Sequence, residues 1–168
     1  MDFDVPIQTA AHVVISLIAI VSGAVVSYGF LAAKRLDLWT AVFLATNDEL
    51  SSWTGIDDPR EAAARILTQG PAMVVVKLGG RGCLVVTAAE HALVDAFPIA
   101  VRNTAGAGDA FSAACVYGYL QGFSLRQIGL LANAVGAASV AKLGTGADLP
   151  HRQEIAQLLA GHGHTFFS

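Results

Sequence analysis

The pattern of hydrophobic and polar positions divides the chain into an uncharged apolar start and a later series of alternating helical and strand-like segments. No residue between Val5 and Ala33 carries a formal charge, and small polar residues interrupt this stretch. The interruptions predict a buried helix over residues 7–21 and a buried strand over residues 24–28. Residues 13–33 are also long enough to span a bilayer, but the interruptions favour the first interpretation over a membrane span.

Apolar runs in the middle of the chain predict neighbouring strands. Residues 72–77 contain three consecutive valines, which is typical of a strand buried on both faces of a sheet. A glycine-rich turn at residues 79–82 leads into further predicted strands over residues 83–87 and 92–96. An earlier short strand is predicted over residues 42–45.

Helical segments alternate with these strands. Asp58 and Pro59 form a helix start, because the carboxylate can accept from backbone N–H groups and proline suits the first turn. Further helices are predicted over residues 48–54, 109–121, 125–142 and 150–160, with a frayed tail over residues 161–168. The alternation predicts one three-layer α/β domain, with helices on both faces of a largely parallel sheet that contains residues 24–28, 42–45 and 73–77 and a local hairpin.

Composition and charge exclude several classes of protein. Of the 168 residues 54% are hydrophobic and 14% charged, which excludes a disordered chain. The net charge of −3 excludes a dominant nucleic-acid footprint, because phosphate binding needs a clustered positive field. Cys83 and Cys115 are too few for a disulfide scaffold, so we expect two buried free thiols and a reducing, cytoplasmic compartment.

The stretch from Asn103 to Phe111 carries the most informative chemistry. Two glycines with one small residue between them let several backbone N–H groups point one way at the start of a helix, where an anion can bind. Asp109, in the first turn of this helix, has two interpretations. As an N-cap it would be a structural residue, and spacing alone favours this. As a general base it would take a proton from an attacking hydroxyl.

The same stretch, read as T-A-G-A-G-D-A-F over Thr104–Phe111, resembles the C-terminal signature of the ribokinase-like (PfkB-type) carbohydrate kinases. Three other segments agree with that family in order and spacing: Thr46–Gly55, Val74–Cys83 and Ala132–Pro150. The resemblance covers about residues 25–159 and implies a ribokinase-like fold that is truncated at the N-terminal side. Residues 1–168 would then form a single partial carbohydrate-kinase domain.

The resemblance implies a phosphotransferase that moves the γ-phosphoryl group of ATP, with Mg²⁺, to a hydroxyl of a small sugar-like or nucleoside-like acceptor. Asp109 would be the catalytic base, and Gly106, Ala107 and Gly108 would form the anion hole. The implied ATP site consists of Lys77, Gly79, Gly82, Asn133 and Asn47, with Asn133 beside the adenine. The chemistry agrees, because phosphoryl transfer depends mostly on positioning and charge stabilisation.

Some positions depart from the family pattern. Asn103 stands where the family usually has the aspartate tied to monovalent-cation binding, and an amide there argues against such a cation. Leu50 stands where a glutamate near the metal is expected, and Glu49 is the substitute metal-site candidate. One step along a helix, however, turns a side chain by about 100°.

The departures leave two functions open. One is a working kinase whose missing parts are supplied by another chain. The other is a catalytically incomplete nucleotide-binding or assembly module derived from the same fold. The half that carries most acceptor contacts in the family has no counterpart in this sequence. The apolar surface that it would cover predicts self-association, for example as a homodimer.

Overall fold

The computed structural model describes residues 41–143 and 149–167. The helix predicted over residues 7–21 and the strand predicted over residues 24–28 lie outside these ranges. No helix in the described ranges is long and apolar enough to cross a membrane.

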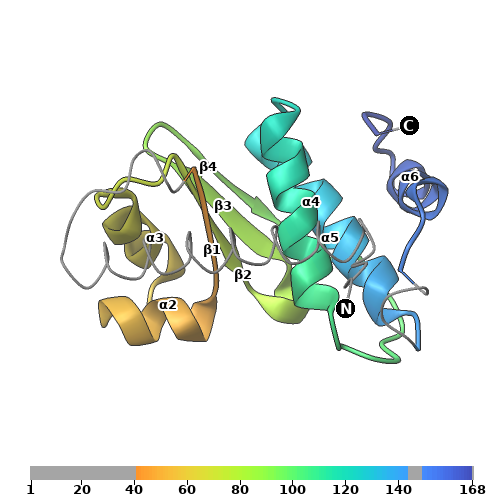
Figure 1. The fold of residues 1–168 in the computed structure, drawn as a ribbon, viewed down its shortest axis with the longest axis horizontal. Helices are drawn as coiled ribbons and strands as arrows, with labels where there is room; N and C mark the ends of the chain where they lie inside the picture. The colour runs from red at the N-terminus through yellow and green to blue at the C-terminus, as the bar shows by residue number, and fades with distance from the viewer. Residues whose placement is uncertain (1–40, 144–148, 168) are drawn as a thin grey trace, which may run out of the picture.

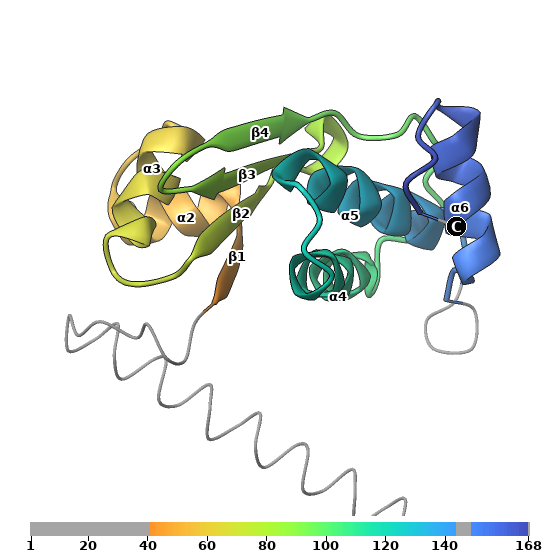
Figure 2. The same ribbon diagram turned by 90° about the horizontal axis from the view of Figure 1, so that it is seen from above.

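Four strands form one mixed sheet in the order β1-β2-β3-β4 (Figure 2). Their bounds are Val42–Thr46, Met73–Lys77, Cys83–Thr87 and His91–Val94. β1 pairs parallel to β2, whereas β2–β3 and β3–β4 are antiparallel. The first three strands confirm the predictions, but the fourth ends at Val94 because the chain leaves the sheet there. The expectation of a largely parallel sheet is wrong for the described strands, since two of their three pairings are antiparallel.

Helices cover both faces of this sheet (Figure 1). Side chains alternate along β2, so that Val74 and Val76 join one apolar cluster while Met73 and Val75 join the other. The first cluster is shared with α2 and α3, and the second with α4, α5 and α6. The bounds of these helices are Asn47–Thr54, Pro59–Leu67, Ala107–Leu120, Leu125–Val140 and Arg152–Gly161. The predicted three-layer α/β architecture is confirmed.

Local sequence explains where the first helices begin and end. Asp58 Oδ1 accepts hydrogen bonds from the backbone N–H groups of Arg60 and Glu61, both at 2.9 Å. Gly55 ends α2 in the left-handed conformation, with φ 70°, as expected of a helix stop. The predicted start at Asp58-Pro59 is confirmed, and α2 is one residue longer than predicted because Thr46 caps it.

Three later helix boundaries differ from the prediction. α4 begins at Ala107 instead of Asp109, because Gly106 occupies the N-cap position with φ 73°. α5 ends at Val140, two residues before the predicted end. α6 begins at Arg152 after an extended His151, so Pro150 lies outside the helix.

The predicted frayed tail after Gly161 is also wrong for residues 162–167. Phe166 and Phe167 are half-buried and pack against the α4–α5 core cluster. The Phe166 ring meets Phe123 edge-on at 5.6 Å, and the Phe167 ring meets Tyr117 edge-on at 6.3 Å. These contacts order the tail because they bury aromatic surface that would otherwise be exposed.

Candidate functional site

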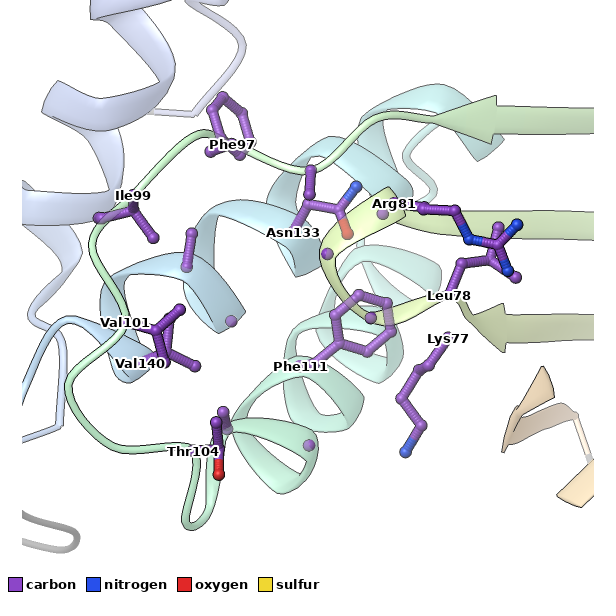
Figure 3. A pocket seen from close by; sticks show the side chains of 18 of the residues that line it. Lys77, Leu78, Arg81, Phe97, Ile99, Val101, Thr104, Phe111, Asn133 and Val140 are labelled. Atoms are coloured by element: carbon purple, nitrogen blue, oxygen red, sulfur yellow. The ribbon is translucent and has the colours of Figure 1, made fainter. Parts of the chain in front are cut away.

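A pocket of about 750 Å³ opens at the carboxyl ends of the parallel strands β1 and β2 (Figure 3). Four segments supply its wall: the β1–α2 junction, the turn after β2, the segment that follows β4, and the facing parts of α4 and α5. Ligand sites in α/β proteins commonly lie at this end of parallel strands. The lining residues include Asn47, Asp48, Lys77, Gly79, Gly82, Phe97, Ile99, Val101, Thr104, Ala107, Gly108, Phe111, Asn133 and Val140.

The β1–α2 junction is held by a capping box. The Glu49 carboxylate accepts from the Thr46 backbone N–H at 2.8 Å and from the Thr46 hydroxyl at 2.9 Å. These two hydrogen bonds lower the pKa of Glu49, and the positive charge of Lys77 adds a smaller lowering. Glu49 does not line the pocket. The structure therefore gives the Glu49 carboxylate a capping role outside the pocket lining.

The neighbours of Glu49 face in different directions. Leu50 is fully buried in the cluster between the sheet and α2–α3, so this position offers no oxygen to a metal. Asp48 lines the pocket, and sequence reasoning missed it. Its signal is its position directly beside Asn47, at the start of the helix that follows β1. Asn47 also lines the pocket, and its Oδ1 atom is buried without a hydrogen-bond partner among the described residues.

Lys77 ends β2 and reaches toward the first turn of α4 (Figure 3). Its Nζ atom is 3.9 Å from the place where a Cβ atom on Gly108 would lie. The Lys77 ammonium thus faces a helix N-terminus, and no other heavy atom lies within 4 Å of the Cβ position of Gly108. Backbone N–H groups, the positive end of the helix and an ammonium group together favour an anion.

The turn after β2 carries Gly79 and Gly82. Gly79 has φ 61° and Gly82 has φ 96°, both in the left-handed region. A Cβ atom on Gly82 would collide with the carbonyl oxygen of Val94 and lie 2.7 Å from the Ala96 backbone nitrogen. Gly82 is therefore required by the approach of two chain segments, whatever the pocket binds.

The glycine loop reaches the pocket with only part of its length. Ala107 and Gly108 line it, whereas Gly106 and Asp109 do not. Asp109 is exposed and occupies the third position of α4, and the N-cap residue is Gly106. The interpretation of Asp109 as an N-cap is therefore wrong. Its carboxylate is at the positive end of the helix, next to the lining residues.

An apolar half of the pocket was also missed at the sequence level (Figure 3). Phe97, Ile99 and Val101 line it, and their signal was the apolar stretch between β4 and the glycine loop; Val140 joins them from the end of α5. Asn133 stands in the wall but uses its Nδ2 atom to donate to the carbonyl oxygens of Val94 and Asp95, each at 3.0 Å. Its oxygen is thus the atom of this side chain better suited to a ligand.

The two cysteines supply no nucleophile to this site. Cys83 and Cys115 are buried free thiols, and burial raises the pKa of Cys83 to about 12 and also raises the pKa of Cys115. Neither is suited to act as a nucleophile near neutral pH. Within residues 41–143 and 149–167, no group of three or more His, Cys, Asp or Glu side chains could hold a metal.

Comparison with known families agrees with the motif at the glycine loop. The model of the pfkB family of carbohydrate kinases matches residues 32–152. An uncharacterized sugar kinase of Archaeoglobus fulgidus is 37% identical over 111 residues, which cover 66% of this chain and 44% of that protein.

Solved structures give the same result. A protein assigned as ribokinase II from Escherichia coli, in complex with ATP and Mg²⁺, superposes with a TM-score of 0.68 at 27% identity, over 74% of this chain and 40% of its own. Arabidopsis thaliana ribokinase, complexed with ribose and ATP, superposes with a TM-score of 0.67 at 28% identity. The superposition covers 72% of this chain and 41% of the ribokinase. The chain thus spans less than half the length of each of these three relatives.

Proposed function

Because this chain belongs to the pfkB family of carbohydrate kinases, we propose that its pocket binds ATP and that it transfers the γ-phosphoryl group to a sugar or nucleoside-like hydroxyl. The similar E. coli protein holds ATP and Mg²⁺, and the similar A. thaliana ribokinase holds ribose and ATP. For the present chain the nucleotide half of the reaction has direct support from geometry. The acceptor half is inferred from the family alone.

The single observation behind this proposal is the position of the Lys77 ammonium opposite Gly108. An ammonium group lies across a side-chain-free gap from the first turn of α4. In this proposal the phosphate chain of ATP occupies that gap, and the flat apolar faces of its adenine base pack against the residues from Phe97 to Val101. The side-chain oxygen Oδ1 of Asn133 can accept a hydrogen bond from the adenine amino group. Gly79 and Gly82 shape the turn that borders the nucleotide.

The glycine loop and Asp109 supply the chemistry in this proposal. The N–H groups of Gly106 and Gly108 stabilise charge that develops on the transferring phosphoryl group. The Ala107 N–H donates to the Thr104 carbonyl at 3.3 Å, so in the expected anion hole Ala107 shapes the loop. Asp109 takes the proton of the acceptor hydroxyl while the oxygen of that hydroxyl forms a bond to the γ-phosphorus. The bond from that phosphorus to the bridging oxygen of ADP breaks, and ADP leaves with the electron pair. The exposure of Asp109 supports this role, because an acceptor can approach it from solvent.

Mg²⁺ fits this pocket only as an ion carried by the nucleotide. Mg²⁺ in nucleotide sites keeps several waters and takes one or two carboxylates besides the phosphates. Asp48 supplies a carboxylate on the pocket wall, and the buried Oδ1 of Asn47 supplies an unpaired acceptor for a metal-bound water. The ion would supply charge neutralisation of the β- and γ-phosphates.

Nucleotide binding is tested by isothermal titration of the purified chain with Mg²⁺-ATP. Lys77→Met keeps the aliphatic length and removes the charge, and should weaken ATP binding by about 10- to 100-fold. Arg65→Met, on the exposed last turn of α3, removes a charge away from the pocket and should leave the affinity unchanged. No ATP binding by the wild type, or equal affinity for Lys77→Met, would contradict the proposal.

The second candidate function is nucleotide binding without phosphoryl transfer. The burial of Leu50 and the capping role of Glu49 favour it, because they leave Asp48 as the carboxylate at the metal side. A transfer assay with ATP, Mg²⁺ and a panel of sugars and nucleosides separates the two functions. Transfer to any acceptor above the hydrolysis background supports the kinase, and ATP binding without transfer supports the second function.

Self-association is a further part of the proposal. α4 carries Asp109 as its sole charged residue, and its outer side chains Val116, Tyr117 and Leu120 are exposed. A helix that is apolar all round is usually buried, so a second copy of the chain is the expected cover. Leu120→Lys should shift sedimentation toward the monomer.

The buried free thiols are consistent with a cytoplasmic location.

A further inference from the structure

The start of the glycine loop is tied to the end of α5 by three N–H donors. The backbone N–H groups of Arg102 and Asn103 both donate to the Val140 carbonyl, at 2.7 and 3.1 Å. The Asn103 side chain donates from Nδ2 to the Leu143 carbonyl at 2.9 Å, across 40 residues of sequence. These bonds join the loop that leads to Gly106 to a helix that forms another wall of the pocket.

The other end of the Asn103 amide turns the loop itself. Its Oδ1 atom accepts from the Ala105 backbone N–H at 3.0 Å. One side chain therefore shapes the loop through its oxygen and anchors it through its nitrogen. Asn103 does not line the pocket, so any effect on a ligand passes through the loop.

The anchor lies at the negative end of a helix. The last carbonyl groups of an α-helix lack intrahelical partners and favour a donor or a cation. At the end of α5 the N–H groups of Arg102 and Asn103 fill this need. The ammonium of Lys142, the nearest basic residue in sequence, is bonded to the Glu154 carboxylate at 2.9 Å.

A carboxylate in place of this amide would change the chemistry. It would offer lone pairs only, directed at the carbonyl oxygen of Leu143, and the contact would become repulsive. Two oxygens that face each other in this way are stabilised by a hydrogen-bond donor or a cation between them. In the present chain the Nδ2 donor occupies that direction, so the residues do not fit the monovalent cation that the family resemblance implies.

We propose that Asn103 is a positioning residue whose amide does the work of a monovalent cation, so that this chain needs neither K⁺ nor Na⁺ to order its glycine loop. The ordering of the loop is independent of the proposed function, whereas its effect on ATP binding rests on it. The Asn103→Asp variant differs by one amide group and should acquire a dependence on the cation.

Thermal unfolding tests the ordering without any nucleotide. Melting is compared in 100 mM potassium chloride and in 100 mM tetramethylammonium chloride, whose large cation cannot replace K⁺. The wild-type melting temperature should be equal in the two salts. In tetramethylammonium chloride, the melting temperature of Asn103→Asp should be lower than that of the wild type by about 3 °C or more. Potassium chloride should restore at least half of this loss. Gln121→Glu, an exposed amide-to-acid change at the end of α4, should show no such salt preference.

Nucleotide titration then tests the effect on the pocket. Wild-type affinity for Mg²⁺-ATP should agree within twofold in the two salts, and Asn103→Asp should lose about tenfold in tetramethylammonium and recover in potassium. A wild type that is stabilised by potassium overturns the proposal, as does an Asn103→Asp variant that responds to potassium no more than Gln121→Glu does. If the wild type binds no ATP in either salt, the proposed function fails, and the melting data still decide the role of Asn103.

Discussion

Two glycine-rich loops border the same pocket, and they need their glycines for different reasons. In the turn after β2, Gly82 leaves room for the Val94 carbonyl, so its lack of a side chain is a condition of the fold. Where the glycine loop enters α4, a Cβ atom on Gly108 would meet nothing closer than Lys77 Nζ at 3.9 Å. The second loop leaves space that the protein itself does not use. At Gly108 this open space lies opposite the Lys77 ammonium, and the two together favour an anionic ligand.

The largest effect is expected at Gly82. Gly82→Ala places a methyl group against backbone atoms of β4 and the following segment, and it also forces alanine to φ 96°. We expect a loss of about 4 kcal/mol or more in the free energy of unfolding, with little folded protein recovered. Gly80→Ala, in the same turn, has open space within 4 Å and should cost less than about 1 kcal/mol. Urea unfolding of both variants measures the difference, and similar stabilities would remove the distinction between the loops.

Asp109 should show the next largest effect, on turnover. If the chain transfers phosphoryl groups, Asp109→Asn removes the proton acceptor and should lower kcat by roughly 10²–10⁴-fold with nearly unchanged ATP affinity. Because Gly106 is the N-cap, the same change should cost less than about 1 kcal/mol of stability, through the helix dipole alone. Equal turnover of the wild type and the variant would end the assignment of Asp109 as the base.

Gly108 should show an effect on binding without a matching effect on folding. Gly108→Val fills the gap beside Lys77 and should weaken ATP binding by about tenfold, while the melting temperature changes little. Gly108→Ala is the graded control and should weaken binding by a smaller factor. Calorimetry with ATP and thermal melting without it give the two readouts. A Gly108→Val variant that unfolds as readily as Gly82→Ala would show that both loops serve the fold.

The smallest effect concerns Glu49, in the capping box behind the pocket-lining residues Asn47 and Asp48. Its pKa is lowered by hydrogen bonds from Thr46, so it lies below the value in the unfolded chain, which is about 4.3. The ionised carboxylate therefore stabilises the fold above that pH, and this contribution is lost as the pH falls through the folded-state pKa. The melting temperatures of the wild type and Glu49→Gln should differ slightly at pH 7 and converge in acid. A difference that persists at pH 3 would assign the effect to packing.

Segments whose structure depends on neighbours in sequence could be predicted. The valine run of β2 is buried on both faces as expected, because alternation and apolar composition are local signals. The start of α3 follows from Asp58 and Pro59, whose hydrogen bonds lie within three residues. The five residues that the family resemblance implied for the nucleotide all line the pocket, from three separate segments of the chain: Asn47, Lys77, Gly79, Gly82 and Asn133.

Features that depend on distant contacts could not be predicted. The tail orders because Phe166 and Phe167 reach Phe123 and Tyr117, about forty residues or more away in sequence. The bond from Asn103 to Leu143 crosses a similar distance. The start of α4 was misplaced for another reason: Gly106 in the left-handed conformation replaces a side-chain cap, and sequence rules for caps look for side-chain oxygens.

The topology of the sheet has a consequence for the order of folding. The antiparallel strands β2, β3 and β4 are consecutive, and α4 and α5 are joined by a short turn, so each group can form from contacts that are local in sequence. The pocket combines residues 46–48 with residues 133–140, and closing so long a loop costs entropy before any contact offsets it. We therefore expect the hairpins to form first and the pocket last. In a stopped-flow refolding experiment, far-ultraviolet circular dichroism should recover before the chain regains the ability to bind a fluorescent nucleotide analogue.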